Sequence, residues 1–295
     1  MENTIDLHCH TTKSDGTYTP DELLKYAESK KLNILSITDH ESVEAYYNLN
    51  RTLFSGTIIP GIELRTSCFG IAIELLAYGF DIDKMRKIIS DCHYKTNPEL
   101  DKYMISLAYE QYTKSGIKLD STFISDFNPK IHPRLSKYIH SSLQKYPENN
   151  IFLENLPEGK SFFRYCMTNP NSPLFLNLTT AFPSIEDLIL SIRSAGGLVS
   201  IPHIFEYKEN AEKILNHLLN NYDIDIIECY YSSFTTEQTS FLLDVCKKYN
   251  KFTSGGSDFH GSIRPSVDLG RGTDNNLHVP EEKISQWISL LNNKL

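Results

Sequence analysis

Histidine and carboxylate side chains at short spacings are the residues of this chain that could do chemistry, because they bind divalent metal ions through nitrogen and oxygen. The first of them stand in the stretch "IDLHCH", where His8 and His10 lie two residues apart. On a strand, residues two apart point to the same side, so both imidazoles could hold one ion. Taken alone, the pair could equally be two surface histidines.

Further apolar stretches end in residues of the same types. His40 ends "LNILSITDH", Glu63 follows "TIIPGI", His203 ends "GGLVSIPH", and "KFTSGGSDFH" ends with Asp258 and His260. A buried carboxylate needs a cation or hydrogen-bond partners, so Glu63 either faces a metal ion or forms a salt bridge with a residue such as Arg65. A site of histidines and carboxylates with hardly any thiolate suits Mn²⁺, Fe²⁺ or Zn²⁺ and leaves positions open for water and substrate.

The elements that must position these residues alternate between strand and helix. Apolar or alternating runs predict strands over 4–10, 32–40, 57–67, 71–80, 196–203, 224–231 and 251–260. Helices are expected over 20–31, 41–54, 184–195, 208–221, 235–249 and 280–293. Thr19, Pro20 and Glu22 have the types and spacing of a capping box at the start of the first helix.

Strand-helix alternation predicts an α/β protein with a mainly parallel sheet, open or closed. In a (β/α) barrel the chemistry lies at the carboxyl ends of the strands, and the candidate residues fall at or just past those ends. The middle of the chain breaks the pattern. We expect residues 82–181 to be a mainly helical insertion, and residues 1–81 and 182–295 to form the main domain. Gly255 and Gly256 should let backbone pack closely before Asp258.

Composition and charge narrow the function. A net charge of −8 argues against a broad basic surface for duplex DNA or RNA, but a small anionic substrate could be neutralised locally. The sequence has no run of about 18 apolar residues, so we expect no membrane-spanning helix. The six scattered cysteines form no C-x-x-C pair, and we expect reduced, mostly buried thiols in a cytoplasmic protein. The sequence has no G-x-S-x-G elbow, P-loop or G-x-G-x-x-G motif.

Together these motifs resemble those of the PHP (polymerase and histidinol phosphatase) superfamily. The matching stretches are "DLHCHTTKSDGTYTPDELLKYA", "LSITDHESVEAY", "IIPGIEL", "SIPH" and "GGSDFHG", in the family's order and spacing. Within it, the chain is most similar to stand-alone bacterial phosphoesterases of the nucleoside 3′,5′-bisphosphate phosphatase and 5′-3′ exoribonuclease type. The resemblance implies a distorted (β/α)₇ TIM-like barrel, an insertion that covers the active site, and two to three divalent ions (Mn, Fe or Zn).

The resemblance also implies the site residues. The metal ligands would be His8, His10, Asp15, His40, Glu63, Glu74, His203, Asp258 and His260. Glu74 stands where the family usually has a histidine, and a carboxylate there favours harder ions over zinc. Glu206 stands where relatives often have an arginine that meets substrate phosphate. His132 and Arg134 in "IHPRL" resemble a substrate-contacting stretch of the family.

The expected activity is hydrolysis of a phosphomonoester or phosphodiester of a small, nucleotide-like substrate by a metal-activated hydroxide. Glu63, Asp258 and His260 would be the catalytic residues, while His132, Arg134 and Glu206 would contact substrate. Three alternatives stay open: a 5′-3′ exonuclease that acts on the ends of short RNA or DNA, an amidohydrolase-like hydrolase, and a degenerate PHP module without activity.

Overall fold

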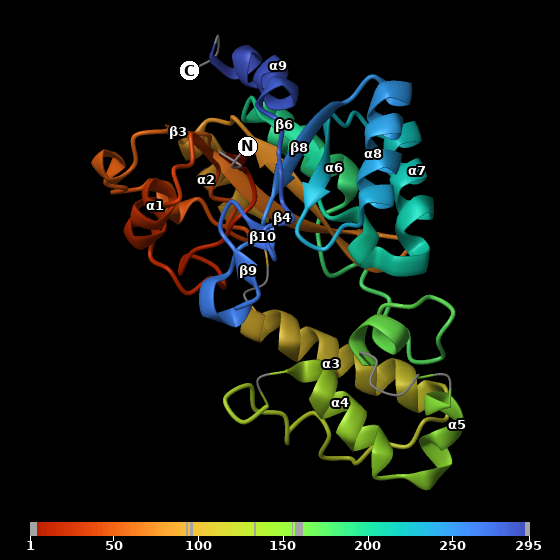
Figure 1. The fold of residues 1–295 in the computed structure, drawn as a ribbon. Helices are drawn as coiled ribbons and strands as arrows, with labels where there is room; N and C mark the ends of the chain where they lie inside the picture. The colour runs from red at the N-terminus through yellow and green to blue at the C-terminus, as the bar shows by residue number, and fades with distance from the viewer. Residues whose placement is uncertain are drawn as a thin grey trace. The chain divides into compact units, whose positions relative to one another are not determined.

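The computed structural model describes residues 5–92, 94, 97–132, 134–154, 156 and 162–292 (Figure 1). It is an α/β protein whose chain divides into two compact units. The first unit comprises Met1–Arg65, Glu74–Cys92 and Ile185–Leu295, and the second comprises Thr66–Ile73 and His93–Ser184.

The strands form three sheets. The first has the order β1-β2-β3, all parallel, with the bounds Ile5–Asp6, Ile34–Leu35 and Thr57–Ile58. The second has the order β4-β5-β6-β7-β8, with the bounds Gly61–Cys68, Ile71–Tyr78, Leu198–Ile201, Ile226–Tyr231 and Phe252–Gly256. Strands β6, β7 and β8 are parallel, whereas β5 is antiparallel to β6. The third sheet pairs β9 (Val267–Asp268) with β10 (Gly272–Thr273).

Single backbone bridges join the first two sheets at two places. A parallel bridge pairs Cys9 with Phe259, just past β1 and β8. Another parallel bridge pairs His40 with Glu63, which brings the chain beyond β2 beside β4. The strands expected over 4–10 and 32–40 are therefore regular only at their starts, and their polar ends run beside neighbouring strands through single bridges.

Amphipathic helices flank the parallel strands. In the first unit they are α1 (Pro20–Ser29), α2 (Ile82–Cys92), α6 (Ile185–Ser194), α7 (Ala211–Asn221), α8 (Thr236–Tyr249) and α9 (Glu281–Asn292). Figure 1 shows α6, α7 and α8 beside the strands β6 to β8. The expected capping box of α1 is confirmed, because Thr19 Oγ1 accepts from Glu22 N and Glu22 Oε2 accepts from Thr19 N.

The prediction of a helix over 41–54 is wrong. This segment contains two short 3₁₀ turns, η1 (Glu44–Tyr46) and η2 (Arg51–Leu53). Glu41 and Asn48 have φ angles of 45° and 60°, which interrupt a right-handed helix. The hydroxyl of Tyr46 donates to the carbonyl of Ile37 and accepts from the backbone of Gly61, so contacts with neighbouring strands override the local helical pattern.

The core of the first unit packs α9 against the strands. Trp287 is fully buried there, and its Nε1 donates to the carbonyl of Thr253 at 2.9 Å. The hydroxyl of Tyr78, also fully buried, donates to the carbonyl of Leu7 at 2.8 Å. Both polar groups are satisfied by strand backbone, as buried hydroxyl and indole groups require. The Trp287 contact holds β8, and the Tyr78 contact holds the chain just past β1, next to His8.

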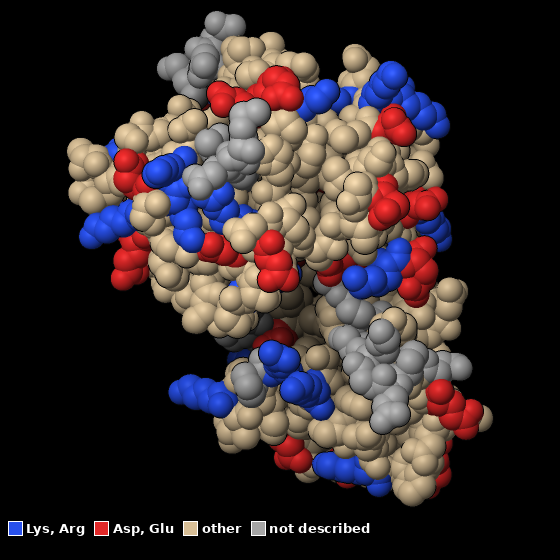
Figure 2. Space-filling model, viewed as in Figure 1, with Lys and Arg blue, Asp and Glu red and all other residues tan. Residues whose placement is uncertain are grey.

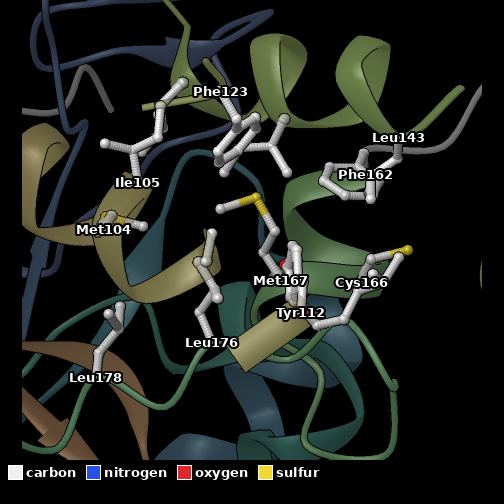
Figure 3. Packing of buried hydrophobic residues seen from close by; sticks show 14 of the residues in the cluster. Met104, Ile105, Tyr112, Phe123, Leu143, Phe162, Cys166, Met167, Leu176 and Leu178 are labelled. Carbon is white, nitrogen blue, oxygen red and sulfur yellow. The ribbon is translucent and has the colours of Figure 1, made fainter. Parts of the chain in front are cut away.

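The second unit has a separate helical core. Its elements are α3 (Asn97–Lys114), α4 (Leu135–Gln144), η3 (Pro147–Asn149), α5 (Asn150–Leu153) and the π-helical turn η4 (Phe163–Met167). Figure 3 shows Tyr112, Phe123 and Met167 packed together in this core. The hydroxyl of Tyr112 donates to the carbonyl of Leu174 at 2.6 Å. The unit thus has its own apolar cluster, as a compact folding unit should.

Two further features concern the whole described chain. All six cysteines are free thiols, and five of them are buried, as expected from their spacing. Among the described residues, none of the helices combines the length and the apolar character needed to cross a bilayer.

Candidate metal centre

Glu63 lies at the centre of the candidate site, among imidazole rings. Its Oε2 atom is 3.2 Å from Nε2 of both His8 and His10. The same oxygen is 3.5 Å from Nδ1 of His40, and Oε1 is 2.8 Å from Nε2 of His203. The side chain is 1% exposed, so this is a buried carboxylate with four histidine neighbours.

Arg65, the alternative partner expected for Glu63, pairs with Glu41. Its Nε and Nη2 atoms donate to the two oxygens of Glu41 at 2.8 and 2.6 Å, and its backbone N–H donates to the same carboxylate at 2.9 Å. Glu41 and Arg65 therefore form a two-pronged salt bridge beside His40 and Glu63. That bridge ties the chain after β2 to β4, the two segments that carry these residues.

Two further carboxylates adjoin the histidines of the cluster. Asp258 Oδ1 is 3.2 Å from His10 Nε2 and 3.5 Å from His8 Nε2. Asp15 Oδ1 is 3.3 Å from His260 Nε2. In each of three sets, one ligand atom per residue lies within 4.8 Å of the others: His8, His10, Glu63 and Asp258; His10, Asp15, His40 and His260; and His40, Glu63 and Glu74. Because the sets share members, they form one continuous cluster.

Unusual backbone angles and a close glycine contact mark three of the ligands. His203 and Asp258 have positive φ angles of 23° and 56°, which are uncommon for residues other than glycine and cluster at functional sites. A Cβ atom on Gly256 would lie 2.3 Å from His8 Cβ and 2.4 Å from His8 N. The expected close packing at this glycine is confirmed, and it sets β8 directly against His8.

Buried carboxylates behind the cluster orient its ligands. Glu228 accepts from His8 Nδ1 at 3.0 Å and from the His203 backbone at 2.7 Å. Asp6 accepts from the Ser257 backbone at 2.9 Å, which fixes the chain before Asp258. Such hydrogen bonds select the tautomer and direction of metal-binding imidazoles.

The loop that carries Asp15 has an equivalent support. Asp39, which is fully buried, accepts from the Thr11 backbone at 2.7 Å and from Ser14 Oγ at 2.6 Å. These bonds hold the loop 11–14 against the end of the neighbouring strand. Asp15 is thereby presented to His260 although it lies outside regular secondary structure.

The ring nitrogens fit metal binding better than hydrogen bonding. Among the described residues, His10 Nε2, His40 Nδ1 and His203 Nδ1 are buried and make no hydrogen bond, which is unusual for buried polar atoms. The carboxylate oxygens near His10 and His40 lie close to these nitrogens but not in the direction that a hydrogen bond requires. His8 faces a carboxylate through each ring nitrogen, yet a neutral imidazole has a single N–H. With Nδ1–H donated to Glu228, the lone pair of Nε2 points to Glu63, as in a metal ligand.

The electrostatics of the cluster also call for cations. Burial would lower the pKa of His10, but Asp258 and Glu63 outweigh it and raise that pKa to about 10. Burial would also lower the pKa of His203, but Glu63 and Glu74 outweigh it and raise that pKa to about 9. The histidines hold the pKa of Glu63 well below its usual range despite burial. Burial, followed by the charge of Glu63, raises the pKa of Glu74.

The nine expected metal ligands thus lie together in the first unit, which also contains Glu206, one of the expected substrate-binding residues. Glu206 lies one turn beyond His203 in η5 (Ile204–Asn210), where its Oε1 accepts from Ser233 Oγ at 2.9 Å. His132 and Arg134 belong to the second unit. The ring of His132 packs against Tyr138 at a centroid distance of 4.6 Å, and Arg134 precedes α4.

Sequence reasoning missed four polar residues of this site. Asp6 and Glu228 interrupt apolar strands, the same signal that identified Glu63, and could have been found by it. Tyr231 donates to Asp258 Oδ2 at 2.8 Å, and Arg264 forms an ion pair with the same oxygen. Tyr231 ends the strand expected over 224–231, the same signal that identified His40 and His203, whereas nothing in the local sequence distinguishes Arg264 from an ordinary surface residue.

Comparison with known proteins identifies the family of this chain. The PHP domain family matches residues 6–156, about half of the chain. The chain belongs to the PHP domain family. The expected superfamily is therefore confirmed, and with it the expected class of enzyme, a metal-dependent phosphoesterase of the PHP family.

Full-length relatives of this PHP protein are distant. The 5′-3′ exoribonuclease of Haemophilus influenzae is 23% identical over 97% of this chain and 99% of its own length. The 5′-3′ exoribonuclease Rnm of Escherichia coli is 22% identical over 90% of this chain and 88% of its own length. The 3′,5′-nucleoside bisphosphate phosphatase of Chromobacterium violaceum is 22% identical, with 92% of each chain covered.

Solved structures show the same PHP fold. An amidohydrolase from Chromobacterium violaceum, with bound sulfate and no metal, has a TM-score of 0.62 and 17% identity, and the match covers 98% of this chain and 96% of that one. A metal-dependent phosphoesterase from Bifidobacterium adolescentis has a TM-score of 0.58 and 18% identity, with 96% and 95% covered. At these identities the likeness concerns the fold.

Proposed function

We propose that this PHP protein hydrolyses a phosphate ester of a small, nucleotide-like substrate, with two to three divalent ions (Mn, Fe or Zn) held by the nine clustered residues. The observation that carries the proposal is the convergence of buried histidine nitrogens on the carboxylates of Glu63 and Asp258. The two kinds of relatives, nucleoside bisphosphate phosphatase and exoribonuclease, support a nucleotide or an oligoribonucleotide end as substrate.

The bound ions would supply Lewis-acid activation of water and neutralisation of phosphoryl charge. Glu63, Asp258 and His260 are the residues we propose as catalytic. Glu63 and Asp258 hold their positions through several histidines each, so their oxygens are preorganised. The Nδ1–H of His260 donates to the Asp258 carbonyl at 2.9 Å, which leaves Nε2 facing Asp15 as a proton acceptor or ligand.

Exposure within the cluster indicates from which side a substrate arrives. His8, His10 and Glu63 are buried, whereas the side chains of Asp15, His40 and Glu74 are 43%, 22% and 28% exposed. We infer that the phosphate approaches past these three residues. Glu74 adds negative charge on that side, so the proposal favours harder ions such as Mn²⁺.

The fold supports this placement of the chemistry. We propose that the strands form a distorted (β/α)₇ barrel, because the bridge Cys9–Phe259 places the chain beyond β1 beside that beyond β8, and the bridge His40–Glu63 places the chain beyond β2 beside β4. The insertion would be residues 82–181, between barrel segments 1–81 and 182–295. His132, Arg134 and Glu206 remain the proposed substrate contacts, and Arg134 would contribute a cation for phosphate.

A substrate panel tests the proposal. Purified protein, stripped with chelator and reloaded with Mn²⁺, is incubated with mononucleotides, 3′,5′-bisphosphates, sugar phosphates and 5′-phosphorylated short RNA. Release of inorganic phosphate from a small nucleotide, abolished by chelator and restored by Mn²⁺, is the expected result. Absence of hydrolysis across the panel, with metal bound, would support the degenerate module.

A second candidate is 5′-3′ exonuclease action on short RNA, which the names of two relatives favour. Figure 2 shows acidic and basic side chains interspersed on the viewed face of the first unit, and the net charge is −8. Such a surface suits recognition of a strand end better than contact along an extended backbone. Stepwise release of 5′-mononucleotides from the RNA, with no phosphate release from mononucleotides, would favour the exonuclease.

A further inference from the structure

Arg264 brings a guanidinium group to the edge of the ligand cluster. It follows the 3₁₀ turn η6 (Gly261–Ile263), which begins directly after His260. The side chain folds back so that Nη1 pairs with Oδ2 of Asp258. Both Nη atoms are also 3.5 Å from the hydroxyl of Tyr231.

The carboxylate of Asp258 separates Arg264 from the histidines. Its Oδ1 faces His8 and His10 at 3.5 and 3.2 Å, whereas Oδ2 receives Arg264 and the hydroxyl of Tyr231. One oxygen of Asp258 therefore faces the proposed metal ligands, and the other pairs with the cation of Arg264. The guanidinium is therefore one carboxylate away from His8 and His10, two of the proposed metal ligands.

The guanidinium has hydrogen-bonding capacity to spare. Within the described part of the chain, its Nε makes no hydrogen bond, and its contacts with Tyr231 lie at the long limit of 3.5 Å. The side chain is 36% exposed, so solvent and ligands can reach it. Arginine presents five donors in a planar fork that matches phosphate oxygens, and it stays charged at any physiological pH.

The charge of the ligand cluster suggests a role for the Arg264 cation. Asp15, Glu63, Glu74 and Asp258 together contribute four negative charges to the cluster. Two divalent ions, the lower of the two proposed numbers, would cancel these charges, and a phosphate monoester then brings up to two further negative charges. A nearby fixed cation would offset part of that charge without occupying a ligand position.

We propose that Arg264 forms an oxyanion subsite for the phosphoryl group at the edge of the metal cluster. The inference rests on the proposed phosphoesterase function and assigns one of its substrate contacts. Without bound cations, the guanidinium neutralises Asp258. When divalent ions share the charge of Asp258, the pull of that carboxylate on Arg264 weakens, and the exposed fork turns its donors to the phosphoryl oxygens.

Inorganic phosphate is the probe that tests the subsite, because its binding requires no turnover. Mn²⁺-loaded wild-type, Arg264→Gln and Arg264→Lys proteins are compared by calorimetric titration with phosphate, and their metal content is measured by elemental analysis. Arg264→Gln should keep the wild-type metal content and bind phosphate about tenfold more weakly or worse, because a charged hydrogen-bonded pair is lost. Arg264→Lys should fall between the two, since lysine keeps the charge but not the fork.

Arg86→Gln is the matched control, because Arg86 forms an exposed ion pair with Glu44. It should bind phosphate like the wild type. Wild-type phosphate affinity in Arg264→Gln would overturn the subsite. So would a loss of bound metal in parallel with phosphate affinity, since Arg264 would then merely position Asp258.

If Arg264→Gln fails to fold, Arg264→Lys decides, and equal phosphate affinity in the lysine variant would overturn the subsite. The proposed function fails separately. If no phosphate ester is hydrolysed but phosphate still binds through Arg264, the function is wrong and the subsite stands. If esters are hydrolysed and Arg264→Gln binds phosphate normally, only the subsite is wrong.

Discussion

Glu228 accepts a hydrogen bond from Nδ1 of His8 at 3.0 Å, and both side chains are fully buried. Its second oxygen accepts from the backbone N–H of His203 at 2.7 Å. One carboxylate thus orients two proposed metal ligands that come from different ends of the chain. Each oxygen of Glu228 accepts from one of these two residues, so we infer that Glu228 positions His8 and His203.

Replacing Glu228 tests this support. Glutamine keeps the shape but has one acceptor oxygen, so either His8 or His203 must face an NH₂ group. Glu228→Gln should weaken metal binding by about 10- to 100-fold while the protein stays folded. Metal affinity is measured by competition with a fluorescent chelator. Glu212→Gln, on the exposed face of α7, serves as control, and equal affinity in both variants would contradict the positioning role.

The contact of Gly256 with His8 predicts a steric effect. A methyl group at Gly256 would lie 2.3 Å from His8 Cβ, so β1 and β8 must separate. Gly256→Ala should destabilise the fold by about 1–3 kcal/mol and reduce the metal content. Chemical denaturation and elemental analysis provide the readouts.

Gly116→Ala is the comparison for Gly256→Ala. Nothing lies within 4 Å of the added methyl there, but the φ angle is +79°. This control should cost about 1 kcal/mol through backbone strain and leave the metal content unchanged. If Gly256→Ala loses no more stability than the control and keeps its metal, the close contact does not matter to the site.

The raised histidine pKa values predict a pH dependence for protein stripped of metal. The pKa is about 10 for His10 and about 9 for His203, against 6.5 for unperturbed histidine. The folded state then holds protons that the unfolded state has released. This contribution to the free energy of unfolding is fully present below pH 6.5 and is lost as the pH rises to about 10.

Urea denaturation in chelator across pH 6 to pH 10 measures the effect, with the same series in saturating Mn²⁺ beside it. Stability without metal should fall across this range. In Mn²⁺ the fall should be smaller or reversed, because metal ions replace the protons and bind more tightly as the pH rises. A flat profile in chelator would show that the carboxylates do not hold these protons.

Glu74 should influence which ion is preferred. Its Oε2 atom is 3.5 Å from His203 Nε2, within the set that includes Glu63. Glu74→His removes one negative charge and supplies a nitrogen ligand, so the preference should shift from Mn²⁺ toward Zn²⁺. Competition binding of the two ions measures the shift. An unchanged preference would mean that the Glu74 side chain is not a ligand.

Much of the site follows from local sequence rules. Period-two spacing places His8 and His10 on one side of the chain, and polar residues at the ends of apolar runs identify His40, Glu63 and His203. The family resemblance was needed for Asp15, which lies in a loop held by Asp39. These residues converge because neighbouring strands end at the same edge of the sheets.

Other parts depend on contacts between distant segments, which local patterns do not encode. The segment 41–54 has helical spacing, yet Tyr46 bonds to Ile37 and Gly61 and the helix does not form. Arg65 could pair with Glu41 or with Glu63, and its pairing with Glu41 depends on how the strands lie together in the fold. Arg264 reaches Asp258 through a turn whose direction the sequence does not reveal.

His10 provides the most direct test of the account, because it belongs to two of the ligand sets and contacts both Glu63 and Asp258. Wild-type protein and His10→Ala are compared for folding by circular dichroism, for metal by elemental analysis, and for phosphate release from the best substrate of the panel. The wild type should hold two to three ions and hydrolyse the ester, whereas His10→Ala should stay folded and lose both metal and activity. Full activity in folded His10→Ala would contradict the metal-centre account.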